Sequence, residues 1–167
     1  MGNENWKILL ILGIDPGTAT TGFGFVQKKG DAFKVLRFGT VTTSPKNTSA
    51  QRLDNLYRQM NLLLKKTKPD LVAIECLYFF KNLKTAIPVA QAAGVIMLAV
   101  QRNRVKIIEL TPLETKMGIC GYGRADKNQM QKMVKNILHM QEIPKPDDAA
   151  DALAIAICAG LKYTTKR

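Results

Sequence analysis

The chain has 167 residues, of which 46% are hydrophobic, enough for one globular domain with a sizeable core. Its 25 Lys and Arg residues outnumber 13 Asp and Glu residues, and the net charge of +12 favours a polyanionic partner, either nucleic acid or an anionic membrane surface. No apolar run approaches the ~18 residues that a membrane span needs. The apolar run at 8–14 lies between Glu4 and Asp15 and lacks the cleavage site of a secretion signal. We therefore expect a cytoplasmic protein that does not act at a membrane.

The cysteines and the histidine restrict the chemistry that this chain can perform. A disulfide framework or a zinc site is not expected, because the three cysteines are far apart and form no C-x-x-C pair: Cys76, Cys120 and Cys158. His139 is the only histidine, and the only two serines, Ser44 and Ser49, lie in one polar segment. A Ser-His-Asp or Cys-His catalytic site is therefore excluded, and any catalysis depends on carboxylates, lysines or a bound metal.

Three strands are predicted at the start of the chain. Residues 8–14 form a continuous apolar run, which is typical of a strand buried on both faces. Residues 22–29 and 32–43 are two further predicted strands, and the short polar link between them indicates a hairpin. Residues 44–49 are a predicted loop.

Helices alternate with strands in the rest of the chain. Apolar side chains recur at helical spacing over 50–66, before Pro69, and the following predicted strand ends in Glu75. The other predicted elements are an Ala-rich helix at 83–103, a strand at 105–110, a short helix capped by Thr111, a Gly-rich loop at 118–127, a basic helix at 125–140 and a last helix at 147–163. This order predicts one α/β domain over 1–167, with a five-stranded mixed sheet of three antiparallel and then parallel strands, flanked by helices.

Two acids stand at the ends of buried strands. Asp15 ends the first strand and Glu75 ends the fourth. Functional side chains of open α/β sheets gather at the carboxyl ends of parallel strands. Each acid alone could be a turn cap or a strand-end residue that faces water. If the strands are neighbours, however, two adjacent carboxylates repel each other and require a cation between them.

The last predicted helix adds more acids. Asp148 and Asp151 are three residues apart and share one helix face, although acids in a first helical turn also stabilise the helix dipole. The apolar residues after Asp151 indicate that this helix packs on the sheet, so Asp151 should point inward. Asp147 is the better candidate for a helix cap, but the residues alone do not decide between Asp147 and Asp148. Glu109 is interpreted as an edge acid and kept in reserve.

Converging carboxylates without His or Cys favour hard cations such as Mg²⁺ or Mn²⁺. Two such ions ~4 Å apart can activate a water and stabilise the leaving oxygen of a phosphodiester. Together with the basic charge, this predicts a nuclease or another phosphoryl-transfer enzyme that acts on nucleic acid.

Four segments resemble, in order, the motif blocks of the bacterial RuvC family of Holliday junction resolvases: "GIDPGTATTGFGFV", "DLVAIECLYFFKN", "GYGRADKNQMQKMV" and "PDDAADALAIAI". The resemblance spans residues 8 to about 158. It implies a ribonuclease H-like fold, a homodimer, and paired nicks in opposite strands of a four-way DNA junction during recombination and repair. A branch-migration helicase complex is a further partner that it suggests.

The resemblance also implies roles for individual residues. The metal ligands fall on Asp15, Glu75, Asp148 and Asp151, which would bind two Mg²⁺ ions with Mn²⁺ as a substitute. The family's functional lysines fall on Lys116 and Lys127. DNA contacts fall on the segment after Glu75, at Tyr78, Phe79, Lys81 and Asn82, with Tyr78 as the aromatic that stacks on an unpaired base. The chain departs from the family pattern at Ala93, where many members have Arg, and at Cys76, where Gln is common.

Three other functions compete with this interpretation. A sugar-kinase or actin-like ATPase shares the strand-Asp-x-Gly-Thr motif, but it needs a second lobe for which this chain is too short. A ribonuclease H-like enzyme acting on RNA usually has a shorter chain without the aromatic and lysine loop. A junction-binding protein that no longer cleaves would not need all four acids, and this chain has them.

Overall fold

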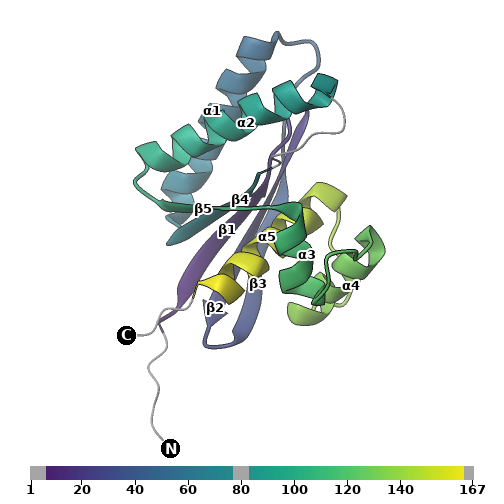
Figure 1. The fold of residues 1–167 in the computed structure, drawn as a ribbon. Coiled ribbons are helices and arrows are strands. Elements are labelled where there is room, and N and C mark those ends of the chain that lie inside the picture. The colour runs from purple at the N-terminus through teal and green to yellow at the C-terminus, as the bar shows by residue number, and fades with distance from the viewer. Residues whose placement is uncertain (1–6, 77–82, 164–167) are drawn as a thin grey trace, which may run out of the picture.

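A computed structural model describes residues 7–76 and 83–163 (Figure 1). One five-stranded sheet with the order β3-β2-β1-β4-β5 forms its centre. The strands are β1 (Leu9–Asp15), β2 (Thr20–Lys29), β3 (Ala32–Thr42), β4 (Leu71–Glu75) and β5 (Lys106–Leu110). β1, β2 and β3 pair antiparallel, whereas β4 pairs parallel to both β1 and β5. The predicted mixed sheet and its strand directions are therefore confirmed.

Helices cover both faces of the sheet (Figure 1). They are α1 (Ser49–Thr67), α2 (Leu83–Arg102), α3 (Pro112–Cys120), α4 (Lys127–Ile137) and α5 (Asp147–Lys162). One core lies between the sheet and the α1–α2 pair, and the other lies between the sheet and α5, with α3 and α4 packed outside it. Within the described ranges, no helix is both long and apolar enough to cross a membrane.

The helix α5 lies unusually close to the sheet because glycines face it. A Cβ at Gly13 would overlap the backbone oxygen of Ala152, and one at Gly22 would overlap the backbone oxygen of Asp148. At Gly24, a Cβ would come within 2.7 Å of Leu153 Cδ2. The alanine-rich face of α5 therefore rests almost directly on the backbones of β1 and β2, which fixes the height of its first turn above the sheet.

Two predicted boundaries in the second half of the chain were wrong. α3 continues to Cys120 and ends at Gly121, whose φ of 77° is a left-handed conformation that glycine adopts without strain. The predicted Gly-rich loop is therefore shorter, at residues 121–126. α4 begins at Lys127 after the N-cap Asp126, and it ends at Ile137, ahead of His139 with its φ of 51°.

Candidate active site

The strand register places Asp15 and Glu75 on the same face of the sheet. β1 and β4 are parallel neighbours in which Gly13 pairs with Ala73, so the two acids are the next pair on that face. Side chains alternate between the faces of a strand. Ala73 packs in the α5 core, and Glu75, two residues later, therefore points toward α5.

The first turn of α5 brings further acids to this edge. Gly22 is the Cα partner of Asp15 in the β1–β2 ladder, and it lies directly beneath the backbone of Asp148. Asp151 follows one turn later, on the part of α5 that faces the end of β4. Residues from the start of the chain, its middle and its end thus meet at the carboxyl edge of the two central strands.

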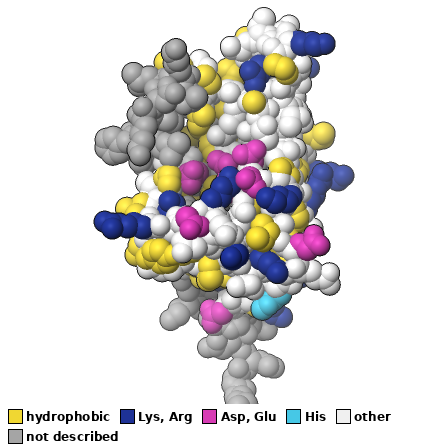
Figure 2. Space-filling model, turned by 90° about the vertical axis from the view of Figure 1, so that its right-hand side faces the viewer, with side chains coloured by type: hydrophobic (Ala, Val, Ile, Leu, Met, Phe, Trp, Pro, Cys, Tyr) yellow, Lys and Arg dark blue, Asp and Glu magenta, His cyan; other side chains and the backbone are white. Residues whose placement is uncertain are grey.

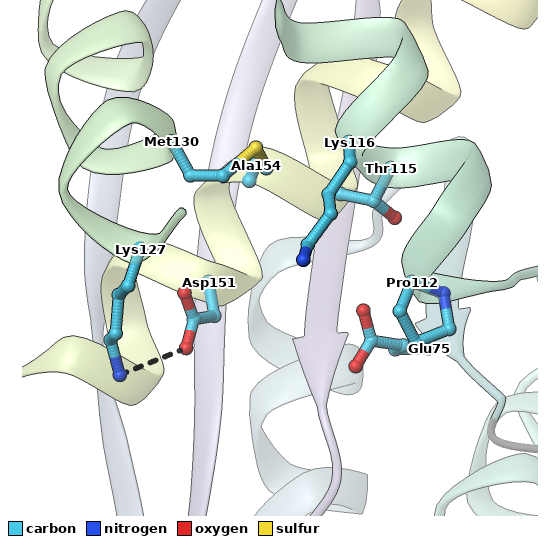
Figure 3. Close-up of a pocket in the computed structure, with 8 residues that line it drawn as sticks. All are labelled: Glu75, Pro112, Thr115, Lys116, Lys127, Met130, Asp151 and Ala154. Atoms are coloured by element: carbon cyan, nitrogen blue, oxygen red, sulfur yellow. Dashed lines mark ion pairs between the residues drawn. The ribbon is translucent and has the colours of Figure 1, made fainter. Parts of the chain in front are cut away.

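A pocket of about 230 Å³ opens beside these acids (Figure 3). Its lining residues come from β4, α3, α4 and α5: Glu75, Pro112, Thr115, Lys116, Lys127, Met130, Asp151 and Ala154. In Figure 3 the carboxylates of Glu75 and Asp151 point into the pocket from two sides, and the Lys116 ammonium hangs between them. Asp15 and Asp148 belong to the same acidic cluster but do not line the pocket itself.

Burial and mutual repulsion raise the pKa values of the acids. The pKa of Asp15 rises from 3.8 to about 8, mainly through burial and then through repulsion from Glu75, Asp151 and Asp148. The pKa of Glu75 rises to about 7, mainly through burial and then through repulsion from Asp151, while the positive charge of Lys116 acts to lower it. Burial also raises the pKa of Asp151, and Lys127 partly offsets it. The cluster is thus short of positive charge.

Lys127, the first residue of α4, is shared by two acids of α5. Its Nζ lies 3.1 Å from Asp147 Oδ2 and 3.5 Å from Asp151 Oδ2. Burial opposes its charge, but the hydrogen bonds to Asp147 and Asp151 outweigh this and raise the pKa of Lys127. The structure thus places the predicted residue Lys127 beside the acids of α5, and the sequence did not indicate its partner Asp147.

Asp147 is not the helix cap that the sequence predicts. Pro146 is the N-cap residue of α5 and makes no side-chain cap. The Asp147 carboxylate instead accepts hydrogen bonds from Lys145 Nζ at 3.0 Å and from Gln131 Nε2 at 3.1 Å, and it pairs with Lys127. Lys145, Lys127 and Gln131 lower the pKa of Asp147 to about 2. The side chain was predicted to be a cap because its partners on α4 are invisible in the local sequence.

The surface around the acids is basic. Figure 2 shows acidic side chains gathered near the centre of this face, with lysine and arginine side chains around them.

Glu109 is exposed on β5 and does not line the pocket, in agreement with its interpretation as an edge acid. The predicted DNA contacts Tyr78, Phe79, Lys81 and Asn82 lie outside the described residues.

The donor set fits hard divalent cations, because the acids offer carboxylate oxygens and none of the described pocket-lining residues is a cysteine or a histidine. Within residues 7–76 and 83–163, no three Asp, Glu, His or Cys side chains converge closely enough to hold an ion as they stand. The acids nevertheless repel one another at one partly buried edge, and Lys127 is already engaged by two acids. This matches the electrostatic demand of a cation site.

Sequence reasoning missed Thr115 and Gln131. Thr115 is buried, lines the pocket and donates its hydroxyl to the Thr111 backbone oxygen at 3.2 Å. Gln131 lies one helical turn after Lys127, so the i, i+4 spacing of these two residues is the signal that could have linked them.

The fold and the acidic edge show to which class of protein the chain belongs. It is a ribonuclease H-like protein with carboxylates at the ends of its two central parallel strands. A family model described as crossover junction endodeoxyribonuclease RuvC matches residues 11–159, and the chain belongs to this family.

Individual relatives agree with this assignment. The chain is 48% identical over 159 residues to the crossover junction endodeoxyribonuclease RuvC of Halothermothrix orenii, covering 95% of this chain and 96% of the relative. The solved structure of Thermus thermophilus RuvC superposes with a TM-score of 0.84 at 31% identity, over 92% of this chain and 94% of that one. The same T. thermophilus protein in complex with Holliday junction substrate gives a TM-score of 0.83 at 28% identity, with the same coverage. The predicted family and fold are confirmed.

Proposed function

We propose that this chain is a single-domain, structure-specific endonuclease of the cytoplasm that resolves four-way DNA junctions in recombination and repair. It would hydrolyse one phosphodiester in each of two opposing strands. The acidic cluster at the ends of β1 and β4, framed by lysines in a chain of net charge +12, is the observation that carries this proposal. The relative solved with Holliday junction substrate supports the choice of DNA substrate.

Asp15, Glu75, Asp148 and Asp151 would hold two Mg²⁺ ions, with Mn²⁺ able to substitute. When bound, such ions supply Lewis-acid stabilisation of charge on the phosphodiester and lower the pKa of the attacking water. The raised pKa values of Asp15 and Glu75 support this assignment, because a nearby cation removes the penalty that burial and repulsion place on their charged forms.

The two lysines would act on the DNA rather than on the ions. Lys116 projects between Glu75 and Asp151, where its ammonium would stabilise negative charge that develops on the phosphodiester. Lys127 would hold the adjacent part of the strand, and its pairing with Asp147 keeps the ammonium at the rim of the pocket. Tyr78, Phe79, Lys81 and Asn82 complete the proposed DNA contacts.

We propose a homodimer that places two such sites on the two-fold symmetric junction. An exposed stripe along α2 supports this proposal. Ile87 and Leu98 are 63% and 51% exposed, and they share a helix face with the exposed small residues Ala90 and Gly94. Leu98→Glu should convert the dimer to monomers in analytical ultracentrifugation. A branch-migration helicase complex stays a prediction from the family resemblance.

The test is cleavage of a synthetic four-way junction, with linear duplex and a structured RNA as competing substrates, in Mg²⁺ and in EDTA. We expect symmetric nicks in the junction only, abolished by EDTA and lowered by at least about 10²-fold in Asp148→Asn. Glu142→Gln removes an exposed acid with the same charge change and should cleave like the wild type. Tight binding without nicks would indicate a non-cleaving junction protein, and preferential cleavage of RNA would indicate the ribonuclease alternative.

A further inference from the structure

A second, smaller cleft lies on another side of the loop that follows Asp15. Its volume is about 120 Å³, and its lining residues come from that loop, α1 and α2: Thr18, Ser49, Arg52, Leu53, Pro88 and Gln91. It shares no lining residue with the pocket of the acidic cluster. The loop connects the two, because Thr18 is only three residues from Asp15.

Arg52 is fixed in this cleft by hydrogen bonds to its neighbours. Its Nε donates to Thr43 Oγ1 at 2.9 Å, and the Thr43 hydroxyl donates to the backbone oxygen of Thr18 at 2.5 Å. The Thr43 N–H also donates to the Ala19 oxygen at 3.0 Å. Thr43 is buried, so it is a rigid support that aligns the guanidinium with the loop after Asp15.

The charge of Arg52 has no carboxylate counterpart in the part of the chain that the structure describes. Arg58, on the same helix, provides a contrast, because its Nη2 pairs with Asp54 at 2.9 Å. A guanidinium has five N–H donors, and only Nε of Arg52 donates to a described residue. Among residues 7–76 and 83–163 its terminal nitrogens have no partner, so toward these residues they are available to a ligand.

The rest of the lining offers further hydrogen-bond donors. Ser49 contributes a hydroxyl and Gln91 an amide, while Leu53 and Pro88 supply apolar walls. None of the described residues that line the cleft is acidic. An aligned guanidinium with neighbouring hydroxyl and amide groups is suited to an anion with several acceptor oxygens, and guanidinium groups bind phosphate oxygens in a bidentate manner.

We propose that this cleft binds a backbone phosphate of the DNA other than the phosphate that is cleaved, with Arg52 as its principal ligand. This inference rests on the proposed function, because the loop from Asp15 to Thr18 links the acidic cluster to this cleft. Occupation of the cleft holds the strand at a second point and sets which phosphodiester reaches the acids. Arg52 is therefore a residue that determines the register of the strand.

The experiment combines protein variants with junctions that carry one uncharged methylphosphonate at successive positions around the cut. Binding is measured in Ca²⁺ by fluorescence anisotropy, and nick positions are mapped in Mg²⁺. Arg52→Ala should weaken binding to the unmodified junction about tenfold and reduce the slope of log K against log salt by about 1. In the wild type, a methylphosphonate at one non-scissile position should weaken binding by the same factor of about ten. The affinity of Arg52→Ala should not change when the methylphosphonate is at that position.

Arg58→Ala is the matched control, since it removes the same charge from the same helix at a residue that is already paired. It should keep the sensitivity of the wild type at every position. Arg52→Lys, which retains the charge and loses the bidentate geometry, should show intermediate binding and scattered nicks, and urea unfolding verifies that each variant is folded.

Either of two results would overturn the inference: binding by folded Arg52→Ala or Arg52→Lys that equals the wild type, or methylphosphonate sensitivity that persists unchanged in Arg52→Ala. A wild type that neither binds nor cleaves junctions refutes the proposed function itself, which distinguishes the two failures.

Discussion

Asp15→Asn should stabilise the protein in the absence of divalent metal while it abolishes cleavage. The pKa of Asp15 is about 8 in the folded protein and 3.8 as its ordinary value. Between these values the folded state holds a proton that the unfolded state releases, so the free energy of unfolding falls as the pH rises from about 4 to 8. An amide carries no charge and removes this contribution.

The magnitude follows from the difference between the two pKa values. One pKa unit corresponds to about 1.4 kcal/mol, which sets an upper bound of roughly 5 kcal/mol at pH 7.5. Rearrangement of the neighbouring acids relieves part of the repulsion, and Glu75 shares the effect in the same direction. We therefore expect Asp15→Asn to gain about 2–4 kcal/mol at pH 7.5 and about 1 kcal/mol or less at pH 5.

The assay is urea unfolding in EDTA at pH 5 and at pH 7.5, with wild type, Asp15→Asn and Glu142→Gln. The exposed Glu142 matches the charge change, and its substitution should leave the wild-type stability unchanged at both pH values. A variant that is no more stable than the wild type at pH 7.5, or whose gain does not shrink at pH 5, would refute the assignment of a repelled, buried carboxylate at Asp15.

The remaining predictions concern the metal, the lysine pair and the helix–sheet contact. Mg²⁺ at 100 times its Kd should stabilise the wild type by about 2.7 kcal/mol in urea unfolding, and much less in Asp148→Asn; equal gains would place the metal elsewhere. Lys127→Ala should lower single-turnover cleavage about 10²-fold. Asp147→Asn should lower the cleavage rate less than Lys127→Ala does, and it should cause no further loss when Lys127 is already alanine. Additive losses in the double variant would show that Asp147 does not act through Lys127. Gly22→Ala should lower the free energy of unfolding by about 1–3 kcal/mol and reduce cleavage as well, because its methyl overlaps the Asp148 backbone; a wild-type rate would contradict the close packing.

The sequence by itself determined most of the local structure and the principal acids. Strands and helices can be predicted from the periodicity of apolar residues. The Thr111 cap and the hairpin at 30–31 depend on residues close together in the chain, so the local sequence is enough to predict them. Asp15 and Glu75 stood out because each ends a buried strand. The family resemblance selected Asp148 over Asp147, a choice that the pattern of acids alone left open.

Only the tertiary structure decided which side chains meet. The Lys127–Asp147 pair depends on how α4 packs on α5. The hydrogen bonds that join Arg52, Thr43 and Thr18 depend on how α1 and the end of β3 pack beside the loop after β1. Such contacts join elements whose separation in sequence carries no periodic signal. The strand register likewise put Asp15 and Glu75 on one face, because a shift of one residue would have turned either acid toward α1 and α2.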